Sequence, residues 1–112
     1  MAYGPFPPPI ARQKGRATST DAVNHELLAA PGAGKKLWIS KMTISNSSLL
    51  DTEVHLKSNN TIIWTTPAPR GGGALEVFLD PIDAAENEAL NFAAASGVTT
   101  ITVSISGFLA VI

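Results

Sequence analysis

The chain has 112 residues, a formal net charge of −1 at pH 7 and no cysteine; 45% of its residues are apolar and 15% are charged. This length suits one domain that buries roughly 65% of the surface of its unfolded chain. The lack of cysteine excludes disulfides and thiolate metal sites, the net charge argues against a nucleic-acid partner, and no apolar run reaches the ~18 residues of a membrane span. Because the charged share is below the ~25% usual for soluble domains, we expect much of the surface to be covered, most simply in a homo-oligomer.

Residues 1–20 differ in composition from residues 21–112. They hold three basic residues and no acid, a net charge of +3, whereas the remaining five bases and nine acids give −4. The run Pro7-Pro8-Pro9 favours extended polyproline II geometry. We therefore predict an extended Pro-rich arm that lies on a neighbouring protein; the alternative is a disordered tail. The residues expected to make the contact are Tyr3, Phe6, Pro7, Pro8, Pro9 and Arg12.

Residues 34–46 are the stretch around which the rest of the chain is expected to pair. They are rich in β-branched and aromatic residues and have no internal proline or glycine, which predicts a long strand. With strict alternation, Leu37 and Ile39 would face one way and Met42 and Ile44 the other. A β-bulge at Ser40-Lys41 would return both pairs to one core.

The rest of residues 21–112 is expected to form a β-sandwich domain. Residues 21–29 are a first strand, with a short helix capped by Asp21 as the alternative. The further expected strands span residues 51–58, 61–66, 75–80, 89–94 and 98–112. Asn59-Asn60 suits a tight hairpin, and the last strand, apolar to its end, should be central or lie in an interface. Six or seven strands with regular turns predict an all-β fold, a small antiparallel β-sandwich or jelly-roll-like barrel.

No catalytic or cofactor signature is found. Residues 32–36 resemble a phosphate-binding loop only faintly, since a strand rather than a helix follows. Four carboxylates in nine residues, Asp80, Asp83, Glu86 and Glu88, do not match a calcium loop and are interpreted as a solvated loop. His25 and His55 lack a nucleophile elbow. We therefore expect no enzyme activity, no cofactor and no metal.

The aromatic residues are the remaining candidates for a binding surface. Trp38, Trp64, Phe78 and His55 could form a platform for sugars or bases. Oligomer packing is favoured instead, because aromatic residues are enriched at interface cores. The residues expected at the subunit interface are Trp38, Trp64 and Phe108.

From about residue 28 to residue 108 the chain carries an ordered series of short motifs. They are Gly34-Lys35-Lys36-Leu37-Trp38-Ile39, Thr43-Ile44-Ser45-Asn46-Ser47-Ser48, Val54-His55-Leu56-Lys57-Ser58, Arg70-Gly71-Gly72-Gly73 and Asn87-Glu88-Ala89-Leu90-Asn91-Phe92. In this order they resemble the small β-sandwich virion proteins of tailed bacteriophages that decorate the capsid.

The resemblance implies a jelly-roll-like structural protein, often trimeric, on the outside of a capsid lattice. The expected partners are the major capsid protein and further copies of the chain, and the expected location is the exterior of the virion. The alternative is a tail- or fibre-associated attachment module that binds host glycans. The Pro-rich arm lies outside the matched region and is supported by its composition alone.

Overall fold

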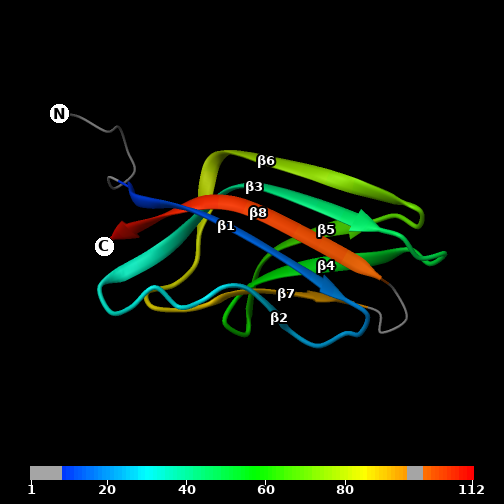
Figure 1. Cartoon of the computed structure of the whole chain (residues 1–112), viewed down its shortest axis with the longest axis horizontal. Helices are drawn as coiled ribbons and strands as arrows, with labels where there is room; N and C mark the ends of the chain where they lie inside the picture. The colour runs from blue at the N-terminus through cyan, green and yellow to red at the C-terminus, as the bar shows by residue number, and fades with distance from the viewer. Residues whose placement is uncertain (1–8, 96–99) are drawn as a thin grey trace.

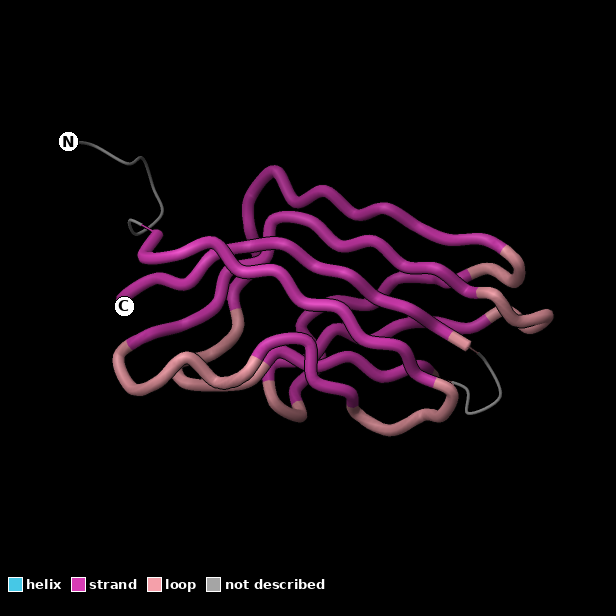
Figure 2. The backbone as a smooth tube through the Cα atoms, in the orientation of Figure 1, coloured by secondary structure: helices cyan, strands magenta, loops and turns pink. Residues whose placement is uncertain are grey.

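The computed structural model describes residues 9–95 and 100–112. Within these ranges the chain forms eight strands and no helix. The described residues therefore contain no helix that could cross a membrane. The strands make two four-stranded antiparallel sheets that pack face to face as a β-sandwich (Figures 1 and 2). The all-β sandwich expected from the sequence is confirmed.

Sheet A has the strand order β1-β8-β3-β6, and sheet B has the order β2-β7-β4-β5. The bounds are β1 Pro9–Ser19, β2 His25–Leu28, β3 Lys35–Asn46, β4 Thr52–Ser58, β5 Thr61–Ala68, β6 Gly72–Asp83, β7 Leu90–Ala94 and β8 Ile101–Val111. The edge strands of the two sheets approach each other on both sides of the sandwich, β1 beside β2 and β5 beside β6.

Strand β3 is the centre of sheet A, because it pairs with β8 on one side and β6 on the other. Its pairing register shifts between Ile39 and Lys41 against both neighbours. As a result Ile39 and Met42 are both fully buried, although they are three residues apart. The predicted bulge is therefore present, and it brings both apolar halves of the strand to the same core.

The core lies between the sheets and follows period-two alternation on each strand. Its largest buried apolar side chains are Ile39, Met42, Ile44, Ile101 and Val103 from sheet A and Val54, Leu56, Leu90 and Phe92 from sheet B. Burying such a side chain fully contributes about 1.5–3 kcal/mol relative to leaving it exposed. The alternation predicted for residues 51–58 is confirmed, and so is the central position of the last strand, since β8 lies between β1 and β3.

The described part of the predicted N-terminal arm has a different structure. Residues 9–19 form β1, which pairs with β8 along its length and belongs to sheet A. This strand could not be predicted from the sequence, because its inward positions carry small or polar residues and show no apolar period. These positions include Gly15, Ala17 and Ser19. Gly15 is required there, since an added Cβ would overlap the carbonyl oxygen of Leu27 in β2.

Two other expected elements differ in extent. Residues 21–29 form only the short strand β2, preceded by a loop. Strand β6 extends beyond the expected residues 75–80 and includes two glycines and Pro81. Where its register against β3 shifts, four residues of β6, 78–81, lie opposite the single residue Ser40. Proline is tolerated there because β6 is an edge strand at an irregularity. Asn59 has a positive φ of 53°, as its predicted hairpin position requires.

Asn46 is a buried polar residue, 1% exposed, at the end of β3. Its amide nitrogen donates to the carbonyl oxygens of Leu50 (2.8 Å) and Ala68 (2.9 Å), and its amide oxygen accepts from the backbone and hydroxyl of Ser48. One side chain therefore satisfies the turn that ends β3 and ties it to β5 in the other sheet.

We predict that Gly107→Ala destabilises the fold by about 1–3 kcal/mol, because overpacking forces the backbone to shift. The new Cβ would overlap the carbonyl oxygen of Trp38 on the neighbouring strand. Gly72→Ala is the matched control, since its Cβ would meet nothing closer than Pro69 O at 3.7 Å. Equilibrium urea denaturation measures both, and equal effects of the two substitutions would contradict the assigned packing.

We predict that Asn46→Ala lowers the free energy of unfolding by about 1–3 kcal/mol, because buried carbonyl groups lose their donor. Asn46→Asp should cost at least as much, since the carboxylate cannot donate to either carbonyl. Ser45→Ala, at the neighbouring exposed position, should change the stability by less than about 0.5 kcal/mol. Thermal and urea unfolding of the three variants test this, and an unaffected Asn46→Ala would refute the role of the amide.

Candidate functional site

The outer face of sheet A, the side turned away from sheet B, is the most distinctive surface of the described chain. The bulge in β3 lets Trp38 and Lys41 both point outward, although strict alternation would place them on opposite faces. The outward positions of β1, β8 and β3 carry cations, hydroxyls and two aromatic rings and no acidic residue. The face divides into a basic patch in the middle and an aromatic patch at one end.

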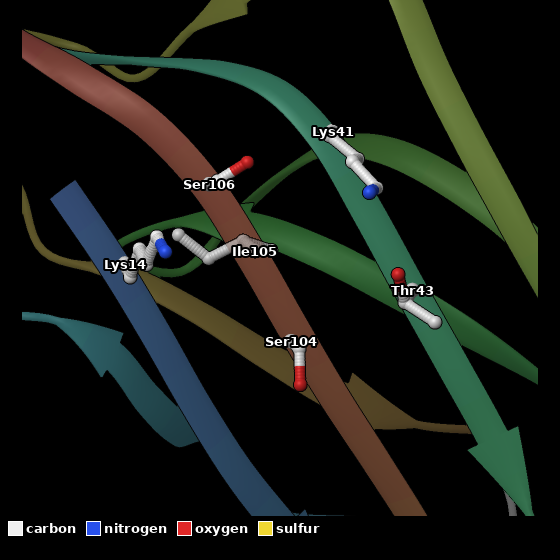
Figure 3. A pocket seen from close by; sticks show the side chains of 6 residues that line it. All are labelled: Lys14, Lys41, Thr43, Ser104, Ile105 and Ser106. Carbon is white, nitrogen blue, oxygen red and sulfur yellow. The ribbon is translucent and has the colours of Figure 1, made fainter. Parts of the chain in front are cut away.

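The basic patch consists of Lys14, Arg16, Lys41, Thr43, Ser104 and Ser106. The register aligns these side chains in two rows across the strands: Lys14, Ser106 and Lys41 in one, and Arg16, Ser104 and Thr43 in the next. A shallow hollow of about 240 Å³ lies in the patch, between Lys14 on β1 and Lys41 on β3, with Ser104 and Ser106 on β8 between them (Figure 3). Such an arrangement can bind an anion through ammonium groups and hydroxyls.

Four cations of this face have no acidic partner among the described residues. Lys14, Arg16, Lys41 and the neighbouring Arg12 are exposed, and none of them forms an ion pair in residues 9–95 and 100–112. Four of the eight basic residues of a chain with net charge −1 therefore lie unpaired on one face. The net charge alone does not reveal this segregation, which creates a local positive potential.

The aromatic patch consists of Trp38, Phe108, Lys36 and Arg12. Trp38 and Phe108 are direct cross-strand neighbours whose rings stack with centroids 6.1 Å apart and planes at 10°. The ammonium of Lys36 lies 4.8 Å from the centroid of the Trp38 ring and pairs with Asp83 at 2.5 Å. Arg12 on β1 is the cross-strand neighbour of Phe108 on the side of β8 away from Trp38. The rings are half-buried and held in place by stacking and by a cation.

The structure thus brings three predicted site residues together and leaves others apart. Arg12, expected in a capsid contact, lies beside Phe108, which in turn pairs with Trp38; both aromatic residues were expected in a subunit contact. Trp64 is on edge strand β5 of sheet B, where its ring meets Phe78 edge-on at 4.9 Å. Pro9 begins β1, and the other arm residues Tyr3, Phe6, Pro7 and Pro8 lie outside the described residues.

Strands β5 and β6 carry exposed apolar side chains on the outer faces of their sheets. Ile62 is 51% exposed, and Leu75 and Val77 on β6 are about 60% exposed. The alternation of residues 75–80 predicts a strand but does not show that Leu75 and Val77 face outward on an edge strand. Leu75 and Val77 lie opposite Thr43 and Lys41, so they border the basic patch on the outer face of sheet A. Exposed apolar side chains are typical of a surface that another chain covers.

Both histidines lie within hydrogen-bond distance of neighbouring side chains. Asp21 accepts hydrogen bonds from His25 Nε2 (2.7 Å) and the Ser19 hydroxyl (3.2 Å), and the bond from His25 lowers the pKa of the Asp21 carboxyl. The Ser19 hydroxyl and the His25 ring both bond to Asp21, and no described contact joins the hydroxyl to the imidazole. In a catalytic triad the imidazole lies between the hydroxyl and the carboxylate, so this arrangement differs from a triad. His55 lies on the outer side of sheet B within 3.1 Å of Thr65 Oγ1.

The predicted acidic loop is only partly a loop, because Asp80 and Asp83 belong to β6, and three of its carboxylates bond to neighbouring elements. Asp83 pairs with Lys36, Glu86 accepts from the backbone of Gly34, and Glu88 accepts from the Ser58 hydroxyl. Within the described ranges, no group of three or more His, Asp or Glu residues is placed to hold a metal ion. These carboxylates fasten the loop to β3 and β4.

Comparisons with known proteins give a weak structural similarity. No family model matches the chain, and no curated protein matches it. Among solved structures, the chain is similar to the extra small virus (XSV) VLP of the giant freshwater prawn Macrobrachium rosenbergii, determined by cryo-EM. The identity is 11% and the TM-score 0.38, over 97% of this chain and 92% of the other. At these values the similarity says nothing about function.

We predict that Trp38 and Phe108 are energetically coupled by about 0.5–1.5 kcal/mol beyond the area they bury. A double-mutant cycle with Trp38→Ala and Phe108→Ala, followed by urea denaturation, measures this coupling. The control cycle pairs Trp38→Ala with His55→Ala on the opposite outer face and should be additive. Additivity in both cycles would mean that the stacked geometry contributes no stability.

Proposed function

We propose that this chain is a structural virion protein that binds the outer surface of a tailed-phage capsid lattice as a decoration, or cement, protein. The observation that carries the proposal is the clustering of Arg12, Trp38 and Phe108 on one exposed face, at the end of sheet A where the chain enters β1. Arginine, tryptophan and phenylalanine are the residues enriched where proteins contact each other. The series of motifs that resembles phage decoration proteins suggests the kind of partner.

The proposed contact with the major capsid protein is made by the N-terminal residues Tyr3, Phe6, Pro7, Pro8, Pro9 and Arg12. Pro9 pairs with Ala110, two residues from Phe108, so the segment before β1 joins the sandwich beside the aromatic patch. Pre-stiffened proline geometry lowers the entropy lost when a segment docks. A contact there joins the arm and the aromatic patch into one continuous surface.

The proposed oligomer is a trimer with Trp38, Trp64 and Phe108 in its interfaces. Trp38 and Phe108 lie on the outer face of sheet A, whereas Trp64 lies at the edge of sheet B. Two different patches meet in a heterologous contact, and such contacts close into a ring when the rotation per subunit fits. Three weak capsid contacts in one ring then bind with the avidity of a linked system.

The stabilising role follows from mass action. A protein that binds only the assembled lattice lowers the free energy of that lattice and not that of its free subunits. No reaction chemistry is needed for this role.

The second candidate is a tail- or fibre-associated module that binds host glycans. The observation that favours it is the basic patch, whose hollow is lined by lysines and hydroxyls. An attachment role and a decoration role differ in copy number and in the ligand of this patch.

We predict that removing residues 1–8 weakens binding to capsids by at least about tenfold, because a few anchors carry most of the energy of an interface. The deletion must stop at residue 8, since β1 begins at Pro9 and a longer deletion would remove part of sheet A. The measurement is co-sedimentation of purified protein with capsids that lack it, and thermal unfolding of the free variant is the folding control.

Unchanged co-sedimentation of the shortened chain would refute the arm contact while leaving decoration standing. Failure of the full chain to sediment with capsids would refute decoration itself. The two results are distinguishable because both proteins are measured in parallel on the same capsids.

A further inference from the structure

The basic patch has a chemical pattern that the aromatic patch lacks. Lys14, Arg16 and Lys41 surround Ser104, Ser106 and Thr43, so each cation has a hydroxyl opposite it on the neighbouring strand. The serines are half-buried, whereas the cations and Thr43 are exposed. Ile105, on the same strand, is buried and lines only the floor of the hollow. An occupant of this hollow therefore meets charge and hydroxyls.

This composition argues against a protein in the patch. Lysine and serine are depleted in the cores of protein interfaces, where aromatic residues, methionine and arginine are enriched. The middle of the patch, with Lys14, Lys41, Ser104 and Ser106, has the opposite composition. A protein contact is better placed on the aromatic patch.

The aromatic rings of this face argue against single-stranded nucleic acid. Single strands are bound by stacking their bases on aromatic rings, but Trp38 is stacked on Phe108 and has Lys36 over its ring.

We propose that the basic patch binds a linear acidic polysaccharide. Such a polymer presents well-spaced carboxylate or sulfate groups with sugar hydroxyls between them, which is the complement of alternating cations and hydroxyls. Lys14, Arg16 and Lys41 would bind the acidic groups, and the side chains of Ser104, Ser106 and Thr43 would exchange hydrogen bonds with the sugar. The inference deepens the second candidate function and does not depend on capsid binding, since decoration uses the aromatic patch.

The test is biolayer interferometry of the full chain on immobilised dextran sulfate, with unsubstituted dextran as the neutral polymer of the same backbone. Alginate provides a carboxylate polymer, and a dT20 oligonucleotide tests nucleic acid. The expected result is binding to dextran sulfate and alginate that weakens as salt rises, weaker binding to dT20 and none to dextran. No binding to either acidic polysaccharide, or tighter binding to dT20, would overturn the proposal.

Variants locate the site. Lys14→Gln/Lys41→Gln should weaken binding to dextran sulfate by about tenfold, the combined loss expected for two exposed charge contacts. The control Lys57→Gln/Arg70→Gln also removes two positive charges, but away from the patch. Lys57 is on β4 of sheet B, where it donates to Asn24, and Arg70 is in the turn before β6. Lys14→Arg/Lys41→Arg keeps the charge and should retain binding.

Equal losses in the Lys14→Gln/Lys41→Gln variant and the control would show that only net charge matters, and this would overturn the assignment to the patch. Because capsid co-sedimentation is measured separately, a failure of polysaccharide binding leaves the decoration proposal untouched.

Discussion

The bulge in β3 is the constraint on which the rest of the structure depends. With one additional residue between Ile39 and Lys41, both halves of β3 contribute apolar side chains to the core. The same shift turns Trp38 and Lys41 to the same outer face. Without it, one half of the strand would present its apolar residues to solvent and Lys41 to the core. Core and functional face are thus produced by one local irregularity.

The neighbours of β3 accommodate this irregularity in different ways. Strand β8 places Gly107 opposite Ile39, where no side chain fits against the backbone of Trp38. Strand β6 places four residues, 78–81, opposite the single residue Ser40, and the first of them, Phe78, is buried with its ring edge-on to Trp64. Both edge strands of sheet A, β1 and β6, then carry side chains suited to contacts outside the chain: cations on β1 and apolar residues on β6.

Much of this fold could be predicted because apolar alternation records which face of a strand is buried. Val54 and Leu56 define β4, and the broken phase around Ser40 indicates the bulge. Strand β1 could not be predicted in this way, because an edge strand that packs through Gly15 and Ala17 has no apolar period. The prolines before it favoured an arm, and tertiary pairing with β8 determined the strand.

The candidate site was predicted in part for a similar reason. Trp38 and Phe108 were expected to contact other subunits. Their direct pairing depends on the register of β3 with β8, which cannot be read from the pattern of residues along the chain. The basic patch was missed because a net charge sums over the chain, whereas binding depends on which face carries the charges. Arg12, Lys14 and Arg16 lie along one face of β1, and this can be seen only when β1 is known to be a strand.

The most direct test of the proposed role is the number of copies of this chain per purified virion, relative to the major capsid protein, by quantitative gel densitometry. Decoration of the lattice predicts a copy number comparable with that of the capsid protein. A handful of copies would contradict it and place the protein at the tail or a single vertex, where the attachment role applies. Absence from purified particles would contradict a structural role in the virion.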